Sequence, residues 1–447
     1  MPINIAEALN AARETKDLLI GNNVLKDVPQ LFKKYFGDKK AIIIADKITY
    51  PIAGKSIYRF LEENLILQDA PFIFEDDDLY AEYSFVSRLA EHLKNTDAIP
   101  LAVGSGTIND LTKLAAHETN RPYMCIATAA SMDGYTAFGA SITADGAKQT
   151  FNCPAPTVCV ADIDIIRDAP EEMTASGYAD LFAKVTAGAD WIVADSLNVE
   201  PIDQQAWSIV QDGLPEALAE PEKAKQKDEI AIQKLISGLM LGGFAMQWSK
   251  SSRPASGAEH QFSHLWNMEH HTNNGEHISH GFQVAIGTLA ITALYEEVLK
   301  YPFDKLDIEK CCEAWPTAQE LELDSKALFK DTDFPEIGYQ ETKAKYIDKE
   351  ALYKQLETLK NNWITIRQKL QKQLLTYGEV KERLRLVGAP YEPEHIGVTR
   401  EYLKSTFVRA QYIRRRFTIL DLIVRTNTLD YFLDRLFGTN GIWEINE

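Results

Sequence analysis

The chain has 447 residues, of which 45% are hydrophobic, and this is enough material for two domains with separate cores. Its 65 acidic and 47 basic residues give a formal net charge of -18. A surface of this sign repels nucleic acid and anionic membranes, so we expect a globular protein that binds neither.

The five cysteines show no C-x-x-C spacing, and an odd number cannot all pair within one chain. We therefore expect a reducing, cytoplasmic compartment. The first residues, MPINIAEALNAARETKD, lack the basic region and apolar core of a signal peptide. No apolar run approaches the roughly 20 residues needed to span a bilayer, so we expect no membrane anchor.

Short apolar, β-branched runs separated by helical patterns fill the first third of the chain. The runs are DLLIG, AIIIAD, PFIFE, AIPLAVG, YMCIAT and TVCVAD. Runs of this kind are typical of strands buried on both faces of a mostly parallel α/β sheet.

The strand pattern stops after about Asp168, near the segment IRDAPEEMTASG. Long amphipathic segments follow, with apolar residues at helical spacing. The sequence therefore predicts an α/β domain over residues 1–168 and an all-α domain over residues 169–447.

A glycine turn, Gly104, Ser105, Gly106 and Thr107, follows one predicted strand and precedes the helical pattern INDLTKLAAHE. Backbone N–H groups and the positive end of a helix in this setting can receive a pyrophosphate. The spacing is not G-x-G-x-x-G, so a tight strand-to-helix turn without a ligand is an equal alternative. Asp46 ends another strand, where it could bind an adenosine ribose or simply stabilise a turn.

Six of the nine histidines fall within residues 256–281. Together with Asp180, His260 and His280 could hold a divalent metal, because two imidazoles and a carboxylate suit zinc, nickel or iron. His264 follows His260 by four residues and shares its helix face, so either or both could reach a metal. Lone histidines more often cap loops or sit satisfied in a core, but their clustering favours a metal site here.

Five segments resemble the sn-glycerol-1-phosphate dehydrogenases, specifically their bacterial branch, in the order found in that family. They are LAVGSGTINDLTK, ATAASMDGYTAFGASI, GYADLFAK, SRPASGAEHQFSHLWNME and HGFQVAIGTL. That family is similar to glycerol dehydrogenase, the iron-containing alcohol dehydrogenases and 3-dehydroquinate synthase. The resemblance implies a nucleotide-binding α/β domain followed by a helical domain that binds metal and substrate.

The resemblance also implies roles for individual residues. Asp180, His260 and His280 would be the metal ligands, and His264 and Asp133 would take part in catalysis, with Asp133 contacting the polyol. The residues expected to bind the cofactor are Asp46, Gly104, Ser105, Gly106, Thr107, Asp110, Thr128 and Ser131. The negative charge of Asp46 should disfavour a 2′-phosphate, so NADH should serve at least as well as NADPH.

The activity implied is metal-dependent reduction of dihydroxyacetone phosphate to sn-glycerol 1-phosphate with NADH or NADPH, and the reverse reaction. One divalent ion, zinc, nickel or iron, would be bound per chain, and the chain would form a homo-oligomer, with a dimer favoured. For the substrate phosphate we expect Arg253 first, because its planar fork binds phosphate bidentately, and Lys148 second. Either residue could instead be an ordinary surface charge.

The chain departs from the resemblance at one point. It has His280, Gly281, Phe282 and Gln283 where many relatives have H-G-E-K, so any role of that acid or lysine does not transfer. Three other functions stay open: a dehydrogenase of unphosphorylated polyols, an NAD-dependent cyclase similar to 3-dehydroquinate synthase, and a metal-binding protein without activity.

Overall fold

A computed structural model describes residues 5–66, 69–144 and 147–445. Contacts within the chain define two compact units. Unit 1 comprises Met1–Leu181, Gln205–Ser252 and Leu386–Gly388, and unit 2 comprises Phe182–Gln204, Arg253–Arg385 and Ala389–Glu447. The sequence analysis divided the chain after residue 168, where the strand pattern stops. The division by contacts differs from it chiefly because residues 205–252 pack with unit 1.

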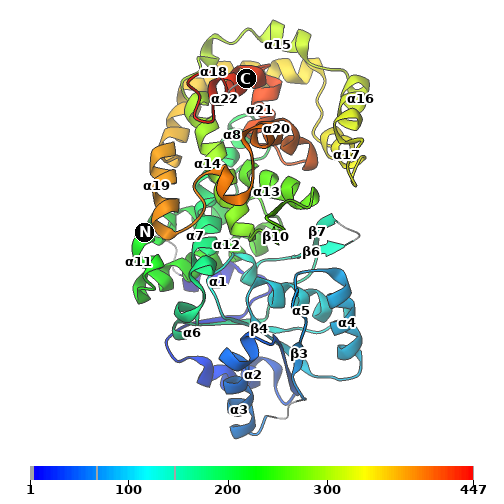
Figure 1. Cartoon of the computed structure of the whole chain (residues 1–447), viewed down its shortest axis with the longest axis vertical. Helices are drawn as coiled ribbons and strands as arrows, with labels where there is room; N and C mark the ends of the chain where they lie inside the picture. Colours follow the sequence, from blue (N-terminus) through cyan, green and yellow to red (C-terminus); the bar gives the residue numbers. More distant parts are fainter. Residues whose placement is uncertain (1–4, 67–68, 145–146, 446–447) are drawn as a thin grey trace. The chain divides into compact units, whose positions relative to one another are not determined.

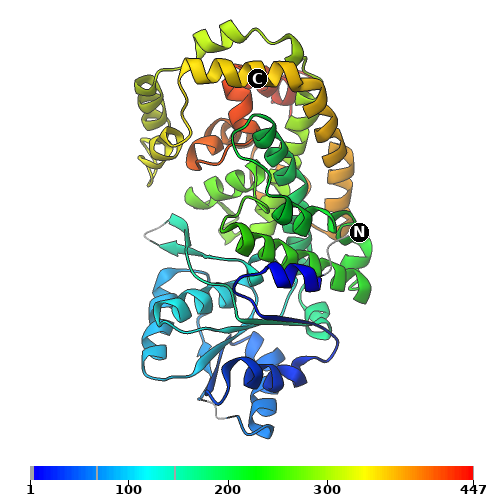
Figure 2. The same cartoon turned by 180° about the vertical axis from the view of Figure 1, so that it is seen from behind.

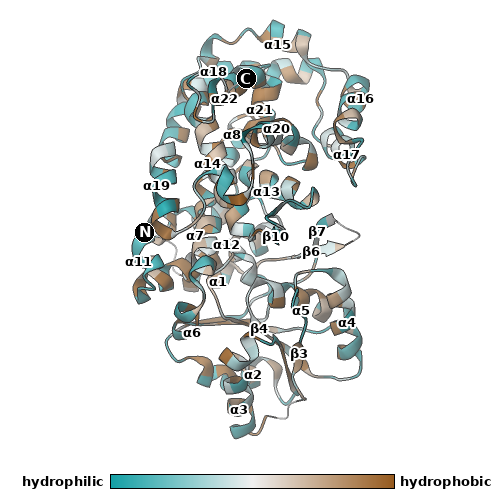
Figure 3. Ribbon diagram, viewed as in Figure 1, coloured by the Kyte–Doolittle hydropathy of each residue, from teal (hydrophilic) through white to brown (hydrophobic). Residues whose placement is uncertain are grey.

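The main sheet of unit 1 has six parallel strands in the order β1-β8-β5-β4-β2-β3 (Figures 1 and 2). Their bounds are β1 Asp17–Gly21, β2 Ala41–Asp46, β3 Phe72–Phe74, β4 Ile99–Gly104, β5 Met124–Ala127 and β8 Val158–Asp162. All six predicted strands are confirmed, and so is the mostly parallel α/β sheet. The apolar residues along these strands are visible as brown ribbon in Figure 3.

One face of the sheet packs against helices α2 (Val28–Phe36) and α3 (Lys55–Glu63). Val28 and Phe32 of α2 and Ile57 and Leu61 of α3 are buried in one cluster with alternate residues of the strands, such as Ile43. Both neighbours in the pleat, Ile42 and Ile44, are also fully buried. Burial on both faces explains why these strands are apolar throughout instead of alternating.

Helix α12 (Glu229–Ser249) packs against α1 (Ile5–Ala11), α6 (Ile163–Asp168) and β1. Its Met240 Sδ lies 3.9 Å from Cys159 Sγ of β8. Among the described residues it is the one helix long and apolar enough to cross a membrane by length and composition, and 67% of its most apolar window is buried. The expectation that no apolar run approaches this length therefore overlooked α12, and packing inside unit 1 accounts for its apolar sequence.

A small antiparallel hairpin was not predicted. It consists of β6 (Ala140–Ala144) and β7 (Ala147–Phe151). The missed strands are short and mix alanine and threonine with other polar residues, so they lack the apolar, β-branched runs that marked the main sheet. The other helices assigned wholly or mostly to unit 1 are α4 Tyr83–Lys94, α5 Gly106–Glu118, α7 Glu171–Phe182, α9 Gln204–Gln211, α10 Leu214–Ala217 and α11 Pro221–Lys225, with short η1 Leu25–Asp27, η2 Tyr50–Gly54 and η3 Gly134–Thr136.

Unit 2 is helical, as predicted, apart from the two-residue strands β9 (Thr272–Asn273) and β10 (Glu276–His277). Its helices are α8 Lys184–Ser196, α13 Ala258–Met268, α14 His280–Val298, α15 Ile308–Ala314, α16 Ala318–Phe329, α17 Ile337–Lys343, α18 Lys349–Gln373, α19 Tyr377–Val387, α20 Arg400–Arg409, α21 Ile419–Arg425 and α22 Leu429–Phe437, with short η4 Phe303–Lys305, η5 Pro393–Ile396 and η6 Ala410–Ile413.

A fully buried carboxyl, Asp190 of α8, joins four segments of unit 2. Its Oδ2 accepts from Ala258 N at 2.7 Å, and its Oδ1 accepts from Tyr295 Oη at 2.5 Å and from Ile419 N at 2.9 Å. Burial, and next the nearby charge of Glu259, raise the pKa of Asp190 to about 7. The carboxyl thereby fixes the first turn of α13 relative to α8, α14 and α21.

Helix α7 passes so close to the backbone at Ala130 that a Cβ on Gly177 would overlap Ala130 O. We predict that Gly177→Ala lowers the free energy of unfolding by about 2–3 kcal/mol, because backbone cannot yield as a flexible side chain can. Thermal and urea unfolding of the full chain measure this. The control is Gly378→Ala in α19, where nothing lies within 4 Å, so unfolding should be unchanged or slightly harder. Equal loss in both variants would contradict the steric explanation.

Candidate metal centre

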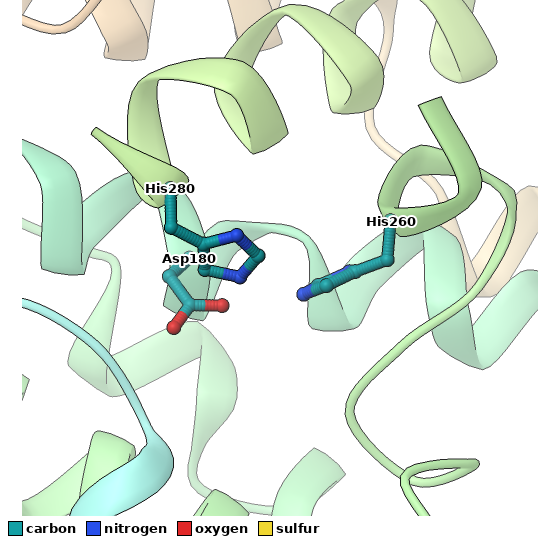
Figure 4. Close-up of side chains that lie close together, drawn as sticks. All are labelled: Asp180, His260 and His280. Carbon is teal, nitrogen blue, oxygen red and sulfur yellow. The ribbon is translucent and has the colours of Figure 1, made fainter. Parts of the chain in front are cut away.

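Asp180 of α7, His260 of α13 and His280 of α14 each offer one ligand atom, and these atoms lie within 4.8 Å of one another. Figure 4 shows the three side chains converging, with a ring nitrogen of His260 directed toward His280 and Asp180. Ligands about 2.1 Å from a single ion stand about 3–4 Å apart, so small side-chain adjustments would let this set bind one. The structure thus brings together the three predicted ligands.

The two histidines meet because α13 packs closely on α14, with the beginning of α13 beside Gly287 of α14. His260 lies in the first turn of α13, and His280 is the first residue of α14, whose N-cap Ser279 accepts from Phe282 N at 3.3 Å. A Cβ on Gly287 would overlap the backbone of Glu259, so only glycine allows this approach. The two imidazole centroids are consequently 5.3 Å apart.

Asp180 is fully buried, and its Oδ2 accepts a hydrogen bond from Asp133 N at 3.0 Å. The backbone thus places Asp133, predicted to contact the polyol, directly beside a predicted metal ligand. The segment after Asp133 is held by Lys113 of α5, whose Nζ donates to the carbonyls of Gly134, Ala137 and Gly139 at 2.9, 3.0 and 2.9 Å.

Glu259 supports His260 from behind. Its Oε1 lies 2.8 Å from His260 Nδ1 and accepts from Gly257 N at 2.6 Å, while its Oε2 accepts from Thr186 Oγ1 at 2.9 Å. Burial alone would raise the pKa of Glu259, but the hydrogen bond and charge of His260 and the Gly257 amide hold it below the ordinary value. A carboxylate at Nδ1 fixes the ring so that Nε2 is the ligand atom.

His264 lies one turn after His260. Its ring centroid is 6.4 Å from that of His260 and 6.5 Å from that of His280. The group of three that can share one ion does not include it. The structure therefore brings His264 to the site without making it one of the three ligands.

The glycine turn connects β4 to α5, with Ser105 as the N-cap residue of α5. A Cβ on Gly104 would stand 2.6 Å from Ile108 Cβ, and a Cβ on Gly106 would stand 3.1 Å from Met132 Cε. Close packing therefore explains both glycines, which is the alternative that the sequence left open. This packing still allows a phosphate group to bind at Thr107, since the positive end of α5 lies at the same turn.

Three of the predicted cofactor-binding residues lie at or just beyond the carboxyl ends of neighbouring strands. Thr128 N donates to Gly104 O at 3.1 Å, joining the ends of β5 and β4. Asp46 ends β2, the other neighbour of β4, and its Oδ1 accepts from Ile48 N at 2.8 Å and from Thr49 N at 2.7 Å. Ser131 follows Thr128 and has its Oγ 3.5 Å from Tyr135 Oη. Ligands of open parallel sheets bind at this edge.

Asp110 and Lys148 form a local charge cluster. Asp110 Oδ2 accepts from Ser141 N at 3.1 Å, and its Oδ1 lies 3.7 Å from Lys113 Nζ. Burial raises the pKa of Asp110 despite the charges of Lys113 and Lys148, and burial lowers the pKa of Lys148 despite the charge of Asp110. Asp110 ties α5 to the β6–β7 hairpin, and the cofactor and phosphate roles of the two residues stay predictions.

Arg253 is only 1% exposed. Its guanidinium donates to Phe417 O at 2.8 Å and to Asp190 O at 3.1 Å, and its Nε lies 3.3 Å from Glu200 Oε2. A phosphate ligand must present N–H groups to the substrate, and these contacts direct them to the interior of unit 2 instead. They lend no support to the prediction of Arg253 as the first phosphate ligand.

Arg416, in the segment before α21, is held inside unit 2: its Nη1 donates to Ser256 O at 2.7 Å, and Gln261 Nε2 donates to its carbonyl at 3.3 Å. Burial, and next the charge of Arg253, lower the pKa of Arg416 to about 9. This C-terminal segment therefore packs on the start of α13. No local signal connects residues so far apart in sequence.

Other supporting residues were also missed. Glu259 stands directly before His260 in sequence, and a carboxylate next to a ligand histidine is a signal that could have been used. Ser263 and Gln283, which lie behind His280, carry no such signal.

The chain thus consists of an α/β part and a largely helical part, with an Asp-His-His group that could hold a metal ion. The sequence model of the iron-containing alcohol dehydrogenase family matches residues 19–170 of the chain. Glycerol dehydrogenase from Schizosaccharomyces pombe has a similar structure, with a TM-score of 0.59 and 17% identity, covering 94% of this chain and 90% of that one. For a probable glycerol dehydrogenase from Sinorhizobium meliloti the TM-score is 0.58, with 14% identity and coverage of 94% and 97%.

Closer similarity is found in sequence. The glycerol-1-phosphate dehydrogenase [NAD(P)+] of Halalkalibacterium halodurans is 34% identical over 289 residues, which are 63% of this chain and 71% of the relative. The enzyme of the same name from Bacillus subtilis is 30% identical over 287 residues, with coverage of 64% and 73%. The chain belongs to the glycerol-1-phosphate dehydrogenase family.

We predict that Glu259→Gln weakens the binding of a divalent metal by about 10–100-fold, because a neutral amide supports the His260 ring less strongly than a carboxylate. Competition with a chromophoric chelator measures the affinity. The matched control is Glu269→Gln at the end of the same helix, where the carboxylate binds Tyr402 and Arg409 and should leave metal affinity unchanged. Unaltered affinity in Glu259→Gln would remove this role from Glu259.

Proposed function

We propose that the chain is a metal-dependent and NAD(P)-dependent oxidoreductase that interconverts dihydroxyacetone phosphate and sn-glycerol 1-phosphate. The observation that carries the proposal is the convergence of Asp180, His260 and His280 in a chain of this family. The relatives are named as NAD(P)-dependent glycerol-1-phosphate dehydrogenases, which supports the choice of substrate and cofactor.

The donor set fits the proposed metal. A buried carboxylate and two imidazoles, one of them held by Glu259, suit zinc, nickel and iron alike. A divalent cation bound there supplies Lewis-acid polarisation of the substrate carbonyl and lowers the pKa of the alcohol in the reverse direction.

The residues of the chain itself have three tasks in this proposal. Asp133, held by its amide against Asp180, orients the polyol, and His264 contacts the substrate beside the metal ligands. The turn from Gly104 to Thr107 binds the pyrophosphate, and Asp110 lies along it. Thr128 and Ser131 face the nicotinamide ribose, and Asp46 binds the adenosine ribose. These positions orient the hydride donor and acceptor, while the hydride chemistry is that of the nicotinamide.

Of the two cations predicted for the substrate phosphate, Lys148 is kept in the proposal. Its amine is partly buried near Asp110, and a phosphate dianion would compete with that carboxylate for it. The homodimer and the cytoplasmic location expected from the sequence belong to the same proposal.

The test is NADH oxidation with dihydroxyacetone phosphate, using chelated protein reloaded separately with zinc, nickel or iron. We expect metal-dependent turnover that forms sn-glycerol 1-phosphate. We predict that His260→Ala loses bound metal and at least about 10³-fold in kcat/KM, because the electrophile is lost with its ligand. His277→Ala, an exposed histidine of the same segment, is the control and should keep full activity.

Other outcomes would assign the site differently. Faster turnover of unphosphorylated dihydroxyacetone would indicate a polyol dehydrogenase, and product formation without net NADH change would indicate a cyclase. A fully metallated and active His260→Ala variant would refute the metal assignment.

Asp46 offers a separate test of the cofactor. We predict that Asp46→Asn raises the ratio of kcat/KM for NADPH to that for NADH by about tenfold, or ~1.4 kcal/mol, because repulsion of the 2′-phosphate is removed. Asparagine keeps the oxygen that accepts from Ile48 N and Thr49 N, so the turn should survive. Asp38→Asn, an exposed carboxylate in the same unit, should leave the ratio unchanged. A constant ratio in Asp46→Asn would place the ribose contact elsewhere.

A further inference from the structure

A chain of buried polar groups extends from His280 along α13 and α14. His280 Nδ1 lies 3.3 Å from Ser263 Oγ, and Ser263 Oγ lies 2.8 Å from Gln283 Oε1. Gln283 Nε2 in turn donates to Asn267 Oδ1 at 3.1 Å. Ser263 and Gln283 are 0% and 1% exposed, so bulk water does not replace these contacts.

The chemistry of each group sets the direction of the hydrogen bonds. Gln283 donates through Nε2 to the Asn267 carbonyl, so its Oε1 faces Ser263 and requires a donor there. The single hydroxyl proton of Ser263 meets that requirement. With the two amides in this orientation, Ser263 Oγ has only lone pairs for His280, so a hydrogen bond between them requires the proton on Nδ1.

This inference rests on the proposed metal site. We propose that Ser263 and Gln283 are positioning residues that select the tautomer of His280 in which Nε2 is unprotonated and able to bind metal. In the other tautomer Nε2 carries the proton and cannot be a ligand.

The same heavy atoms would also accept the opposite polarity. With both amides turned, Gln283 would donate to Ser263, Ser263 would donate to His280 Nδ1, and Nε2 would be protonated. Metal binding at Nε2 is therefore linked to the direction of the hydrogen bonds in the relay formed by Ser263, Gln283 and Asn267. Disturbing this relay should weaken metal binding, although neither Ser263 nor Gln283 is a ligand.

The two histidines are thus supported by groups of different charge. His260 faces the Glu259 carboxylate, whereas His280 faces a neutral hydroxyl backed by a neutral amide. The two negative charges of Asp180 and Glu259 already balance a divalent ion. A neutral support for His280 avoids a third carboxylate, which would weaken the attraction of the ion for a substrate oxygen.

The first experiment measures zinc affinity of the chelated full-length chain by competition with a chromophoric chelator. The zinc affinity of Ser263→Ala and of Gln283→Leu should each fall by about tenfold or more. Gln283→Glu keeps an oxygen acceptor for Ser263 and should bind zinc as tightly as the parent. Thr292→Val is the matched control, because it removes a buried hydroxyl of α14 that donates to Thr288 O within its own helix. Parent-like affinity in both Ser263→Ala and Gln283→Leu would overturn the proposal.

The second experiment reads the tautomer directly by ¹⁵N NMR of the metal-free chain labelled at histidine, at about pH 8, above the usual imidazole pKa. The His280 signals are assigned with His280→Gln. We expect protonated Nδ1 in the parent and mainly protonated Nε2 in Ser263→Ala. Protonated Nε2 in the parent would overturn the proposal.

The outcomes separate this inference from the proposed function. A parent chain that binds no zinc, nickel or iron would overturn both. A parent that binds zinc tightly, together with a Ser263→Ala variant that binds it equally well, would overturn only the role of the relay.

Discussion

The close packing of α13 on α14 is the constraint on which the candidate site depends. Gly287 lets the Glu259 backbone reach α14, and this brings two histidines twenty residues apart in sequence into one group. The same contact aligns the groups behind them, since Ser263 and Gln283 are partners across these two helices. Any larger residue at position 287 would separate both the ligands and their supports.

Unit 2 stabilises the start of α13 with buried charge. Asp190 and Glu259 are both fully buried, and each accepts several hydrogen bonds, which offset the cost of removing a carboxyl group from water. Distant segments contribute as well: the amide of Ile419 donates to Asp190, and the guanidinium of Arg416 donates to the carbonyl of Ser256, just before α13. The C-terminal residues, which carry no recognisable motif, are thus part of what holds His260 in place.

The sequence predicted what is encoded locally. The six strands of the main sheet were recognisable because strands buried on both faces are continuous apolar runs, and the ligands were recognisable because histidines clustered beside family-like segments. The hairpin was missed because its strands carry little apolar signal. Arg253 was assigned to phosphate because no local pattern shows whether an arginine is buried, and the supports Ser263 and Gln283 emerge only when α13 and α14 are packed.

Lys113 links helix α5 of unit 1 to the segment that follows Asp133. One ammonium group bound to the carbonyls of Gly134, Ala137 and Gly139 ties the segment from Gly134 to Gly139 to α5. The preceding residue, Asp133, is bonded through its amide to Asp180. Two sets of hydrogen bonds therefore connect the helix that follows the glycine turn to the carboxylate of Asp180, although the two lie in distant parts of the sequence.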